Sequence, residues 1–370
     1  MAKKILITGA HGFIGKNLAV RLRELDANKV IKFGRHESIK NLEAMVNKVD
    51  FIVHLAGENR PKDPISFDRV NAKLTRTLCN IIQNTGRNIP LILASSIKAS
   101  IDSPYGKSKL AAENVVKAYA RTTNNSVAVY RLPGVFGKWC KPNYNSVVAT
   151  FCYNVARGLP IEIRDPSFNL TLVYIDDLID DFLRLIENFT PGVSEGKISQ
   201  TYDITLNELA NKLRAFDDLR KNLMLDKVGV GLIRALYATY VSHLPTEKFT
   251  YDLPKYDDSR GSFVEILRTP ETGQFSYFTI KPGVTRGSHY HHSKTEKFLI
   301  VKGTARLKFR HLITNETFEV TVFGGQSTIV DSVPGWVHDI TNIGDSEAYV
   351  MLWANELFNR ERPDTEAQEV

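Results

Sequence analysis

Three glycines near the start of the chain restrict its fold more than any other feature. Gly9, Gly12 and Gly15 form GxxGxxG, after the apolar run Lys4–Thr8 and at the start of the helical pattern Phe13–Glu24. Glycines there let the backbone turn tightly against a pyrophosphate, and the helix N-terminus offers free N–H groups. The sequence therefore predicts a strand–turn–helix unit that binds a dinucleotide. A glycine turn that only packs helix on strand is the alternative.

Apolar runs alternate with amphipathic helical segments over the first half of the chain. Further strands are predicted at residues 30–33, 50–55, 90–94 and 127–131, and further helices at residues 74–83 and 108–120. Buried apolar strands separated by helices are typical of βαβ units joined into a parallel sheet. Residues 206–240 follow a helical pattern throughout.

The pattern changes near residue 245. Residues 246–260 carry proline and several charges, and we expect them to form a linker. From Ser262 onward only short strands are predicted, at residues 263–267, 274–280, 298–301, 305–310, 317–322, 327–330 and 348–353. Such spacing is typical of an all-β barrel or sandwich. We therefore expect two domains, residues 1–245 and 246–370.

Composition narrows the class of protein and its partners. Of 370 residues, 43% are hydrophobic and 24% are charged, which excludes a disordered chain, a collagen and a coiled coil. The net charge of +7 is dilute and contains no long basic block, so we expect anionic small molecules rather than nucleic acid. Three cysteines without a CxxC motif indicate a reducing compartment. With no apolar run of about 18 residues, we expect a cytoplasmic protein without membrane contact.

A basic residue follows the second predicted strand. An NAD site usually carries Asp or Glu at that strand end to hold the ribose hydroxyls, whereas Arg35 stands there in this chain. Because a guanidinium pairs well with a 2′-phosphate, the sequence favours NADP as the cofactor. The alternative is that Arg35 is a solvated surface charge.

Tyr105 and Lys109 form YxxxK, with Ser96 at the end of a predicted strand upstream. If a helix begins here, the phenol and the ammonium lie on one helix face. A neighbouring ammonium is expected to lower the phenol pKa, so that Tyr105 exchanges a proton near neutral pH. The Ser96 hydroxyl could bond the reacting oxygen.

Together with HLAG at residues 54–57, Asn71, RLPGVFG at 131–137 and VYIDD at 173–177, these motifs resemble the extended short-chain dehydrogenase/reductases. That family acts mainly on nucleotide sugars. The resemblance implies that Tyr105 is the acid/base, Lys109 tunes it and binds the ribose, and Ser96 polarises the carbonyl. It places further cofactor contacts at Gly9, Gly12, Phe13, Ile14, Gly15, Arg35, Leu55 and Ala56. The family's dehydratases carry Asp-Glu after the serine or threonine; Ile97 and Lys98 follow here, which favours ketone reduction, with 4-epimerisation possible.

A second cluster lies in the predicted β region. His289, His291, Glu296 and His338 match both cupin motifs, which this region resembles. HxH on one strand places both imidazoles on one face, and three imidazoles with a carboxylate suit Zn, Fe, Mn, Ni or Cu. The alternative is a metal-free cupin that uses histidine as a base.

A further motif precedes the histidines. DxRGxFxE, from Asp258 to Glu265, resembles the opening of the deoxysugar 3,5-epimerase cupins, in which the arginine, here Arg260, meets the nucleotide diphosphate. Arg306, Lys308 and Arg310 alternate on one strand face. They could face the same anion, or they could be a solvated edge.

The stretches 136–147 and 287–299 resemble bifunctional capsular-polysaccharide enzymes that fuse an extended reductase to a cupin. The resemblance implies an α/β Rossmann-like, doubly wound parallel sheet followed by an all-β cupin barrel. It also implies a homodimer with zinc in the cupin, NADP(H) and a UDP-sugar substrate, with Asn143 as a candidate substrate contact. The expected reactions are C3 epimerisation of a UDP-2-acetamido-2,6-dideoxy-4-hexulose and then C4 reduction with NADPH. The product is the L-talose derivative, on the route to UDP-N-acetyl-L-fucosamine.

Two other functions stay open at this point. The cupin could be a structural, dimerising metal module of a protein that is only a reductase. An NADP-binding redox sensor is disfavoured, because such sensors typically lose the Tyr–Lys pair that this chain keeps. The residue that takes the C3 proton is also open among His289, His291, His338, Tyr290 and Lys302.

Overall fold

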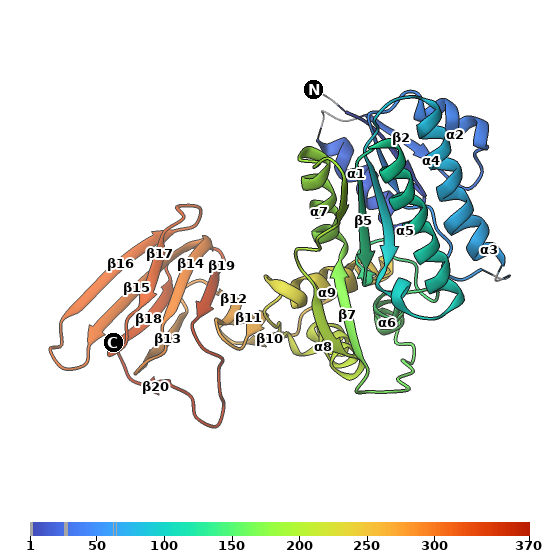
Figure 1. Ribbon diagram of the computed structural model, residues 1–370. Coiled ribbons are helices and arrows are strands. Elements are labelled where there is room, and N and C mark those ends of the chain that lie inside the picture. The colour runs from blue at the N-terminus through green and yellow to red at the C-terminus, as the bar shows by residue number, and fades with distance from the viewer. Residues whose placement is uncertain (1–2, 26–28, 62, 64) are drawn as a thin grey trace. The chain divides into compact units, whose positions relative to one another are not determined.

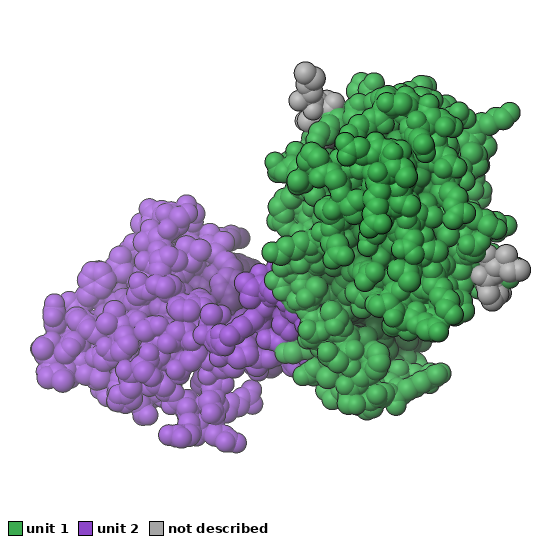
Figure 2. Space-filling view, in the orientation of Figure 1, with its two compact units in different colours: residues 1–213, 235–244 green, residues 214–234, 245–370 purple. Residues whose placement is uncertain are grey.

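The computed structural model describes residues 3–25, 29–61, 63 and 65–370. The chain divides into two compact units, coloured separately in Figure 2. Unit 1 comprises Met1–Leu213 and Ala235–Leu244, and unit 2 comprises Arg214–Arg234 and Pro245–Val370. The segment 214–234 thus packs with the second unit. A boundary near residue 245 between two activities stays a prediction.

A parallel sheet forms the centre of unit 1 (Figure 1). Its strands lie in the order β2-β1-β3-β4-β5-β8, and all described pairs are parallel, as predicted. They are β1 (Lys4–Thr8), β2 (Lys29–Phe33), β3 (Phe51–His54), β4 (Leu91–Ser96), β5 (Val127–Leu132) and β8 (Val193–Glu195). The order reverses at β1, whose neighbours are β2 and β3, and ligands of such sheets bind at this switch point.

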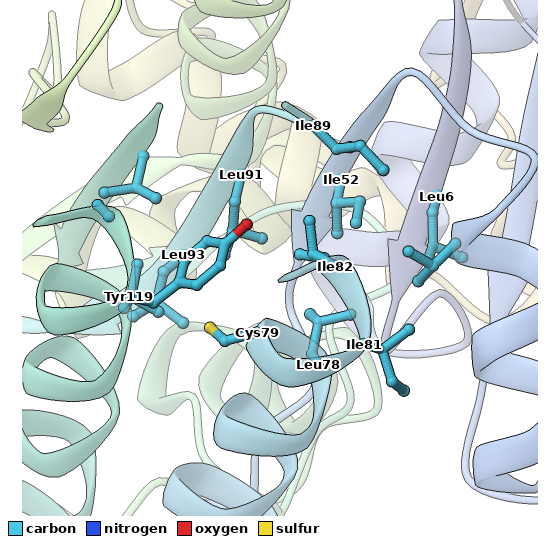
Figure 3. Packing of buried hydrophobic residues seen from close by; sticks show 14 of the residues in the cluster. Leu6, Ile52, Leu78, Cys79, Ile81, Ile82, Ile89, Leu91, Leu93 and Tyr119 are labelled. Carbon is cyan, nitrogen blue, oxygen red and sulfur yellow. The ribbon is translucent and has the colours of Figure 1, made fainter. Parts of the chain in front are cut away.

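Helices cover both faces of the sheet (Figure 1). The helices on the two faces are α1 (Phe13–Glu24), α2 (Ile39–Val46), α4 (Leu74–Asn84), α5 (Pro104–Thr123) and α7 (Ile175–Glu187). α1 packs on α7, while α4 packs on α2 and α5. Figure 3 shows Leu78 and Ile82 of α4 against Ile52 and Leu91 of the sheet, where all four side chains are buried. This apolar core holds the strand ends in fixed positions.

Smaller elements complete unit 1. They are α3 (Ile65–Phe67), the π-helical turn Asp68–Lys73, the 3₁₀ turn Ile97–Ser100, α6 (Val147–Ala156), and the sheet of β6 (Gly134–Phe136), β7 (Asn169–Tyr174) and β9 (Tyr202–Thr205). One predicted helix start needs correction. α5 begins at Pro104 rather than at residue 108, because Ser103 caps it by accepting the Gly106 N–H.

The helix predicted over residues 206–240 is interrupted. The structure has α8 (Leu206–Asn222) and α9 (Gly231–Ser242), and Leu223 follows α8 with φ of 59°. That left-handed backbone ends the helix. The segment after α8 then pairs with another part of unit 2, since the Arg268 N–H donates to the Leu223 carbonyl and the Leu225 N–H donates to the Arg268 carbonyl.

Two antiparallel sheets form unit 2, in the orders β10-β11-β12-β19-β14-β17 and β16-β15-β18-β13-β20. The first contains β10 (Lys255–Asp258), β11 (Gly261–Thr269), β12 (Gly273–Ile280), β14 (Glu296–Lys302), β17 (Ile329–Ser332) and β19 (Ala348–Ala354). The second contains β13 (Thr285–Tyr290), β15 (Thr304–His311), β16 (Thr317–Phe323), β18 (Trp336–Asn342) and β20 (Glu366–Ala367). Phe278 and Ile300 of one sheet share a core with Leu307 and Ile340 of the other.

The all-β character of this region is confirmed. The linker expected over residues 246–260 is wrong in part, because it contains the 3₁₀ turn Thr246–Lys248 and β10, which pairs with β11. Buried and partly exposed side chains alternate along β15. Its buried residues Ala305, Leu307 and Phe309 lie in the core that the two sheets share. No helix in the described part of the chain is long and apolar enough to cross a membrane.

Candidate functional site

The glycine turn lies at the switch point of the parallel sheet, between β1 and α1. Gly9 has φ of 68°, and a Cβ there would lie 2.7 Å from the Ala56 amide nitrogen. A Cβ on Gly15 would lie 2.4 Å from the Gly9 carbonyl oxygen. Among the described residues no side chain caps α1, and its first turn holds no acidic residue. Its first N–H groups therefore suit a pyrophosphate, so the turn fits a bound dinucleotide.

The other predicted cofactor residues lie around this turn. Phe13 and Ile14 begin α1. The Leu55 N–H donates to the Thr8 carbonyl at 3.1 Å, and the Ala56 N–H donates to the Thr8 hydroxyl at 3.2 Å, so the end of β3 is fixed beside the end of β1.

Arg35 follows β2 and projects into solvent, with 78% of its side chain exposed. Its Nη2 donates to Glu58 Oε2 at 2.9 Å. Glu58 is thus a residue of this region that the motifs did not reveal. A guanidinium near the end of β2 fits a ribose 2′-phosphate, provided that it leaves Glu58.

Ser96, Tyr105 and Lys109 come together at the end of β4. Ser96 is the last residue of β4, and the other two lie on the first turns of α5, as predicted. Burial raises the pKa of Tyr105, and a hydrogen bond with the Ser96 side chain opposes this rise. The expected lowering of the phenol pKa is therefore wrong: the Lys109 ammonium donates instead to the Ala94 carbonyl at 3.0 Å.

The pKa of Lys109 is also shifted. Its side chain is buried, and this burial lowers its pKa to about 8, although Glu113 one helical turn away opposes the shift. Glu113 is fully buried, accepts from Ser95 at 2.6 Å and pairs with Arg131 at 2.8 Å. Its position four residues after Lys109 on one helix face was a signal that could have revealed it.

A chain of buried polar groups supports the site from behind. His54 Nδ1 lies 2.6 Å from the Thr8 hydroxyl and its Nε2 lies 2.9 Å from the Thr75 hydroxyl. Burial lowers the His54 pKa to about 3, so the ring is neutral. Asn71, in the π-helical turn, donates to the Ser108 hydroxyl at 2.9 Å and accepts the Glu58 N–H at 2.8 Å. These contacts tie the glycine turn to α5.

Asn143 lies in the loop between β6 and α6. Its backbone has φ of 54°, and its N–H donates to the Thr150 hydroxyl at 3.0 Å. Its side chain is exposed. Within the described ranges, no hydrogen bond joins Asn143 to Tyr105 or to Ser96.

In unit 2 the four predicted ligands form one cluster. The candidate ligand atoms of His289, His291, Glu296 and His338 lie within 4.8 Å of one another. His289 faces His338 across the β13–β18 pair, after a bulge at Ser288. His291 lies one residue beyond β13, so the two histidines of HxH do not share a regular strand as expected.

The charges in the cluster suit a cation. Burial opposes the ionisation of Glu296, but the neighbouring His291 and His338 rings, whose Nε2 atoms lie 3.4 and 3.6 Å from its Oε2, and the Lys294 ammonium outweigh it, so its pKa is well below the usual range. Burial, with the neighbouring His338, lowers the His289 pKa to about 4. The buried Nε2 atoms of all three histidines lack a hydrogen-bond partner within the described part of the protein. A carboxylate with three imidazoles fits a divalent metal ion.

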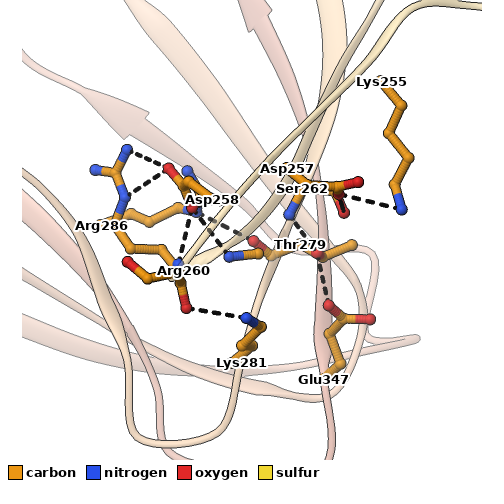
Figure 4. A network of polar contacts seen from close by, with 11 residues as sticks. Lys255, Asp257, Asp258, Arg260, Ser262, Thr279, Lys281, Arg286 and Glu347 are labelled. Carbon is orange, nitrogen blue, oxygen red and sulfur yellow. Dashed lines mark hydrogen bonds and ion pairs between the residues drawn. The ribbon is translucent and has the colours of Figure 1, made fainter.

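Arg260 lies in the β10–β11 hairpin (Figure 4). Asp258 accepts from Arg260 Nη2 at 2.7 Å and from Arg286 Nη2 at 3.3 Å. The Arg260 hydrogen bond, above all, lowers the Asp258 pKa to about 2. Arg286 lies on β13, three residues before His289, and is largely buried. This cation was missed, although its place in RGSH beside the histidine motif was a usable signal.

Arg306, Lys308 and Arg310 do not face the anion expected at Arg260. Their neighbours Leu307 and Phe309 point into the core, where Phe309 lies 6.1 Å from the His338 ring. Successive side chains of a strand point to opposite faces, so the three cations lie on the outer face, away from the cluster. Of the other base candidates, Lys302 is exposed and lies over the Tyr349 ring.

Comparisons with known proteins match both units. Residues 5–200 match the family described as "NAD dependent epimerase/dehydratase family". The chain belongs to this family. Residues 256–366 match a domain described as "Polysaccharide biosynthesis C-terminal domain". This member of the family thus carries a second, C-terminal β domain.

Relatives of this epimerase/dehydratase family member cover its full length. It is 50% identical over 364 residues to the UDP-2-acetamido-2,6-beta-L-arabino-hexul-4-ose reductase of Pseudomonas aeruginosa, with 98% of each chain covered. The structure of the capsular polysaccharide assembling protein CapF from Staphylococcus aureus superposes with a TM-score of 0.91, at 40% identity and with all of both chains covered. The predicted resemblance to fused capsular-polysaccharide enzymes is confirmed.

More distant structures share the fold of the first unit. The UDP-glucuronic acid 4-epimerase of Bacillus cereus, solved with NAD, matches with a TM-score of 0.55 at 19% identity, covering 65% of this chain and 98% of its own.

Proposed function

We propose that the protein converts a UDP-2-acetamido-2,6-dideoxy-4-hexulose in two steps. Unit 2 epimerises C3, and unit 1 then reduces the C4 ketone with NADPH. The product is UDP-2-acetamido-2,6-dideoxy-L-talose, on the route to UDP-N-acetyl-L-fucosamine for surface polysaccharide. The observation that carries the proposal is the 50% identity over 98% of both chains to a protein named as a reductase of such a 4-ulose.

The geometry of unit 1 supports ketone reduction. When bound, NADPH supplies the hydride. Tyr105 delivers the proton to the developing alkoxide, and its raised pKa keeps the phenol protonated at neutral pH, as a proton donor requires. Ser96 bonds the ketone oxygen, while Lys109 places a positive charge behind the phenol and binds the ribose. Arg35 holds the 2′-phosphate.

The cluster in unit 2 supports epimerisation. A C4 ketone acidifies the C3 hydrogen, because the resulting negative charge delocalises onto the ketone oxygen as an enolate. His289, His291, Glu296 and His338 would hold a zinc ion, which would supply positive charge to stabilise the enolate. The residue that accepts the C3 proton is not assigned, because the three histidines of the cluster would be ligands of the metal. Arg260 and Arg286 both donate to Asp258, so their guanidinium groups lie close enough together to hold the diphosphate. In unit 1, Asn143 contacts the sugar.

The order of steps follows from the ketone. Reduction at C4 removes the group that acidifies C3, so epimerisation comes first. The two reactions therefore use one substrate in sequence, with residues 1–245 as the reductase and 246–370 as the epimerase.

One experiment reports both steps. The full-length protein is incubated with a UDP-4-keto-6-deoxy amino sugar and NADPH in D2O, and the product is examined by NMR. Deuterium at C3 with inverted configuration, and a hydroxyl at C4, is the expected result. A C4 alcohol that keeps hydrogen at C3 would support a reductase with a structural β domain. Retention of the ketone would remove the reductase proposal.

A further inference from the structure

The segment 364–369 lies against the loop that carries the histidine–glutamate cluster. Asp364 uses both carboxylate oxygens there. Oδ1 accepts the His292 N–H at 2.8 Å, and Oδ2 accepts the Ser293 and Lys294 N–H groups at 2.7 Å each. One carboxylate thus fixes three consecutive amides, all between the cluster residues His291 and Glu296.

The same residue orients an imidazole of the cluster. The carbonyl of Asp364 accepts a hydrogen bond from His291 Nδ1. This contact directs the Nδ1 proton to Asp364 and turns Nε2 toward the cluster, where Glu296 Oε2 lies 3.4 Å away. Partners of this kind fix the tautomer and the ring orientation of metal-binding histidines.

Further contacts continue along the segment. Residues 366–367 form β20, which pairs with His289 and Tyr290 of β13. The Gln368 N–H donates to the Ser288 carbonyl at 3.0 Å, at the bulge that places His289 opposite His338. The segment therefore touches the backbone on both sides of HxH.

This segment adds little to the apolar core. Residues 366–369 are exposed, and the core of unit 2 takes no residue from 355–370. Its contacts are hydrogen bonds to residues 288–294 and one to β15, where Arg310 Nη2 donates to the Glu369 carbonyl at 2.6 Å. Lys294, whose N–H binds Asp364, also places its ammonium 3.1 Å from Glu296 Oε1. Most hydrogen bonds of the segment thus go to residues that surround the cluster and its charge partner Lys294.

We propose that residues 364–369, here named the 364–369 strap, position the cluster for metal binding, with Asp364 as the main positioning residue. This inference rests on the metal site of the proposed function. It assigns to Asp364 no contact with the ion or the substrate.

The test measures Zn²⁺ binding by the full-length protein. Asp364→Ala removes the acceptor for three amides, and Asp364→Asn keeps one acceptor oxygen. Zn²⁺ release to a chromogenic chelator should be fastest for Asp364→Ala, with affinity reduced roughly 10- to 100-fold, and intermediate for Asp364→Asn. Asp345→Ala, at an exposed bend of the same unit, should match the unchanged protein.

Two further measurements separate positioning from general stability. The thermal unfolding of the metal-free variants should stay close to that of the unchanged protein, because the strap lies outside the core. Imidazole ¹⁵N spectra should show the Nδ1–H tautomer of His291 in the unchanged protein and a mixture of tautomers after truncation at residue 363.

The outcomes are distinguishable. If Asp364→Ala and Asp364→Asn both hold Zn²⁺ as tightly as the unchanged protein, the strap proposal is wrong while the metal site stands. If the unchanged protein itself takes up no Zn²⁺, the metal part of the proposed function fails and the strap proposal fails with it. If Asp364→Ala unfolds early, Asp364→Asn is compared with Asp345→Ala instead. A lower Zn²⁺ affinity of Asp364→Asn supports the strap proposal, and an equal affinity overturns it.

Discussion

The two candidate sites are built in opposite ways. Ser96, Tyr105 and Lys109 come from one strand end and the helix that follows it, whereas the cluster of unit 2 joins β13, β14, β18 and the 364–369 strap. Burial acts on both: it lowers the pKa of Lys109 and of His289. It leaves a protonated phenol in unit 1 and a neutral His289 beside a carboxylate in unit 2. Under the proposed function, one site gives a proton, and the other holds a cation and removes a proton.

The largest expected effect separates the two sites. Tyr105→Phe removes the proton donor, so NADPH oxidation should fall by about 10²- to 10⁴-fold. Deuterium exchange at C3 should continue, because it needs only unit 2. Tyr153→Phe, on α6, is the control and should leave both rates unchanged. Loss of exchange together with reduction would show that the sites are not independent.

The reciprocal change acts on unit 2. Glu296→Gln removes the negative charge of the cluster, so Zn²⁺ affinity and C3 exchange should fall by more than the roughly 10- to 100-fold typical of outer-shell changes. Reduction of a sugar already inverted at C3 should persist, as measured by NADPH absorbance. Glu319→Gln, on the outer face of β16, should change neither. Unchanged exchange in Glu296→Gln would favour a base that acts without metal.

The pH dependence should differ between the sites. Because burial lowers the Lys109 pKa to about 8, this ammonium loses its proton well below the range of a free lysine. The kcat/KM of reduction should therefore fall as pH rises through about 8, and the kcat/KM of C3 exchange should not follow. Initial rates in a buffer series test this, and a flat reduction profile up to the pKa of free lysine would contradict the role of Lys109.

The smallest effect concerns the cofactor. Arg35→Ala should raise the KM for NADPH by about tenfold, the equivalent of one charge-assisted hydrogen bond, with little change for NADH. Arg164→Ala removes a still more exposed arginine and should have no effect. Equal changes for both cofactors would mean that Arg35 does not read the 2′-phosphate.

The two sites also differ in how much of each could be predicted from the sequence. Tyr105 and Lys109 are four residues apart on a helix, so their shared face could be predicted from spacing. The outer position of Lys308 could not, because strand alternation defines two faces without saying which one meets the core. Asp364 and Glu58 carry no local signal either: Asp364 binds backbone groups 70 or more residues away, and such a partner is set only by the folded chain.

The division of the chain also bears on protein engineering. The backbone passes between the units after residues 213, 234 and 244, so each unit is made of two separate stretches of the chain. A fragment cut at residue 245 would lose the backbone that bonds Arg268 on β11. Expressing unit 2 alone thus calls for joining residues 214–234 to the fragment by a linker, because a simple truncation would leave the strand edge at Arg268 without these partners.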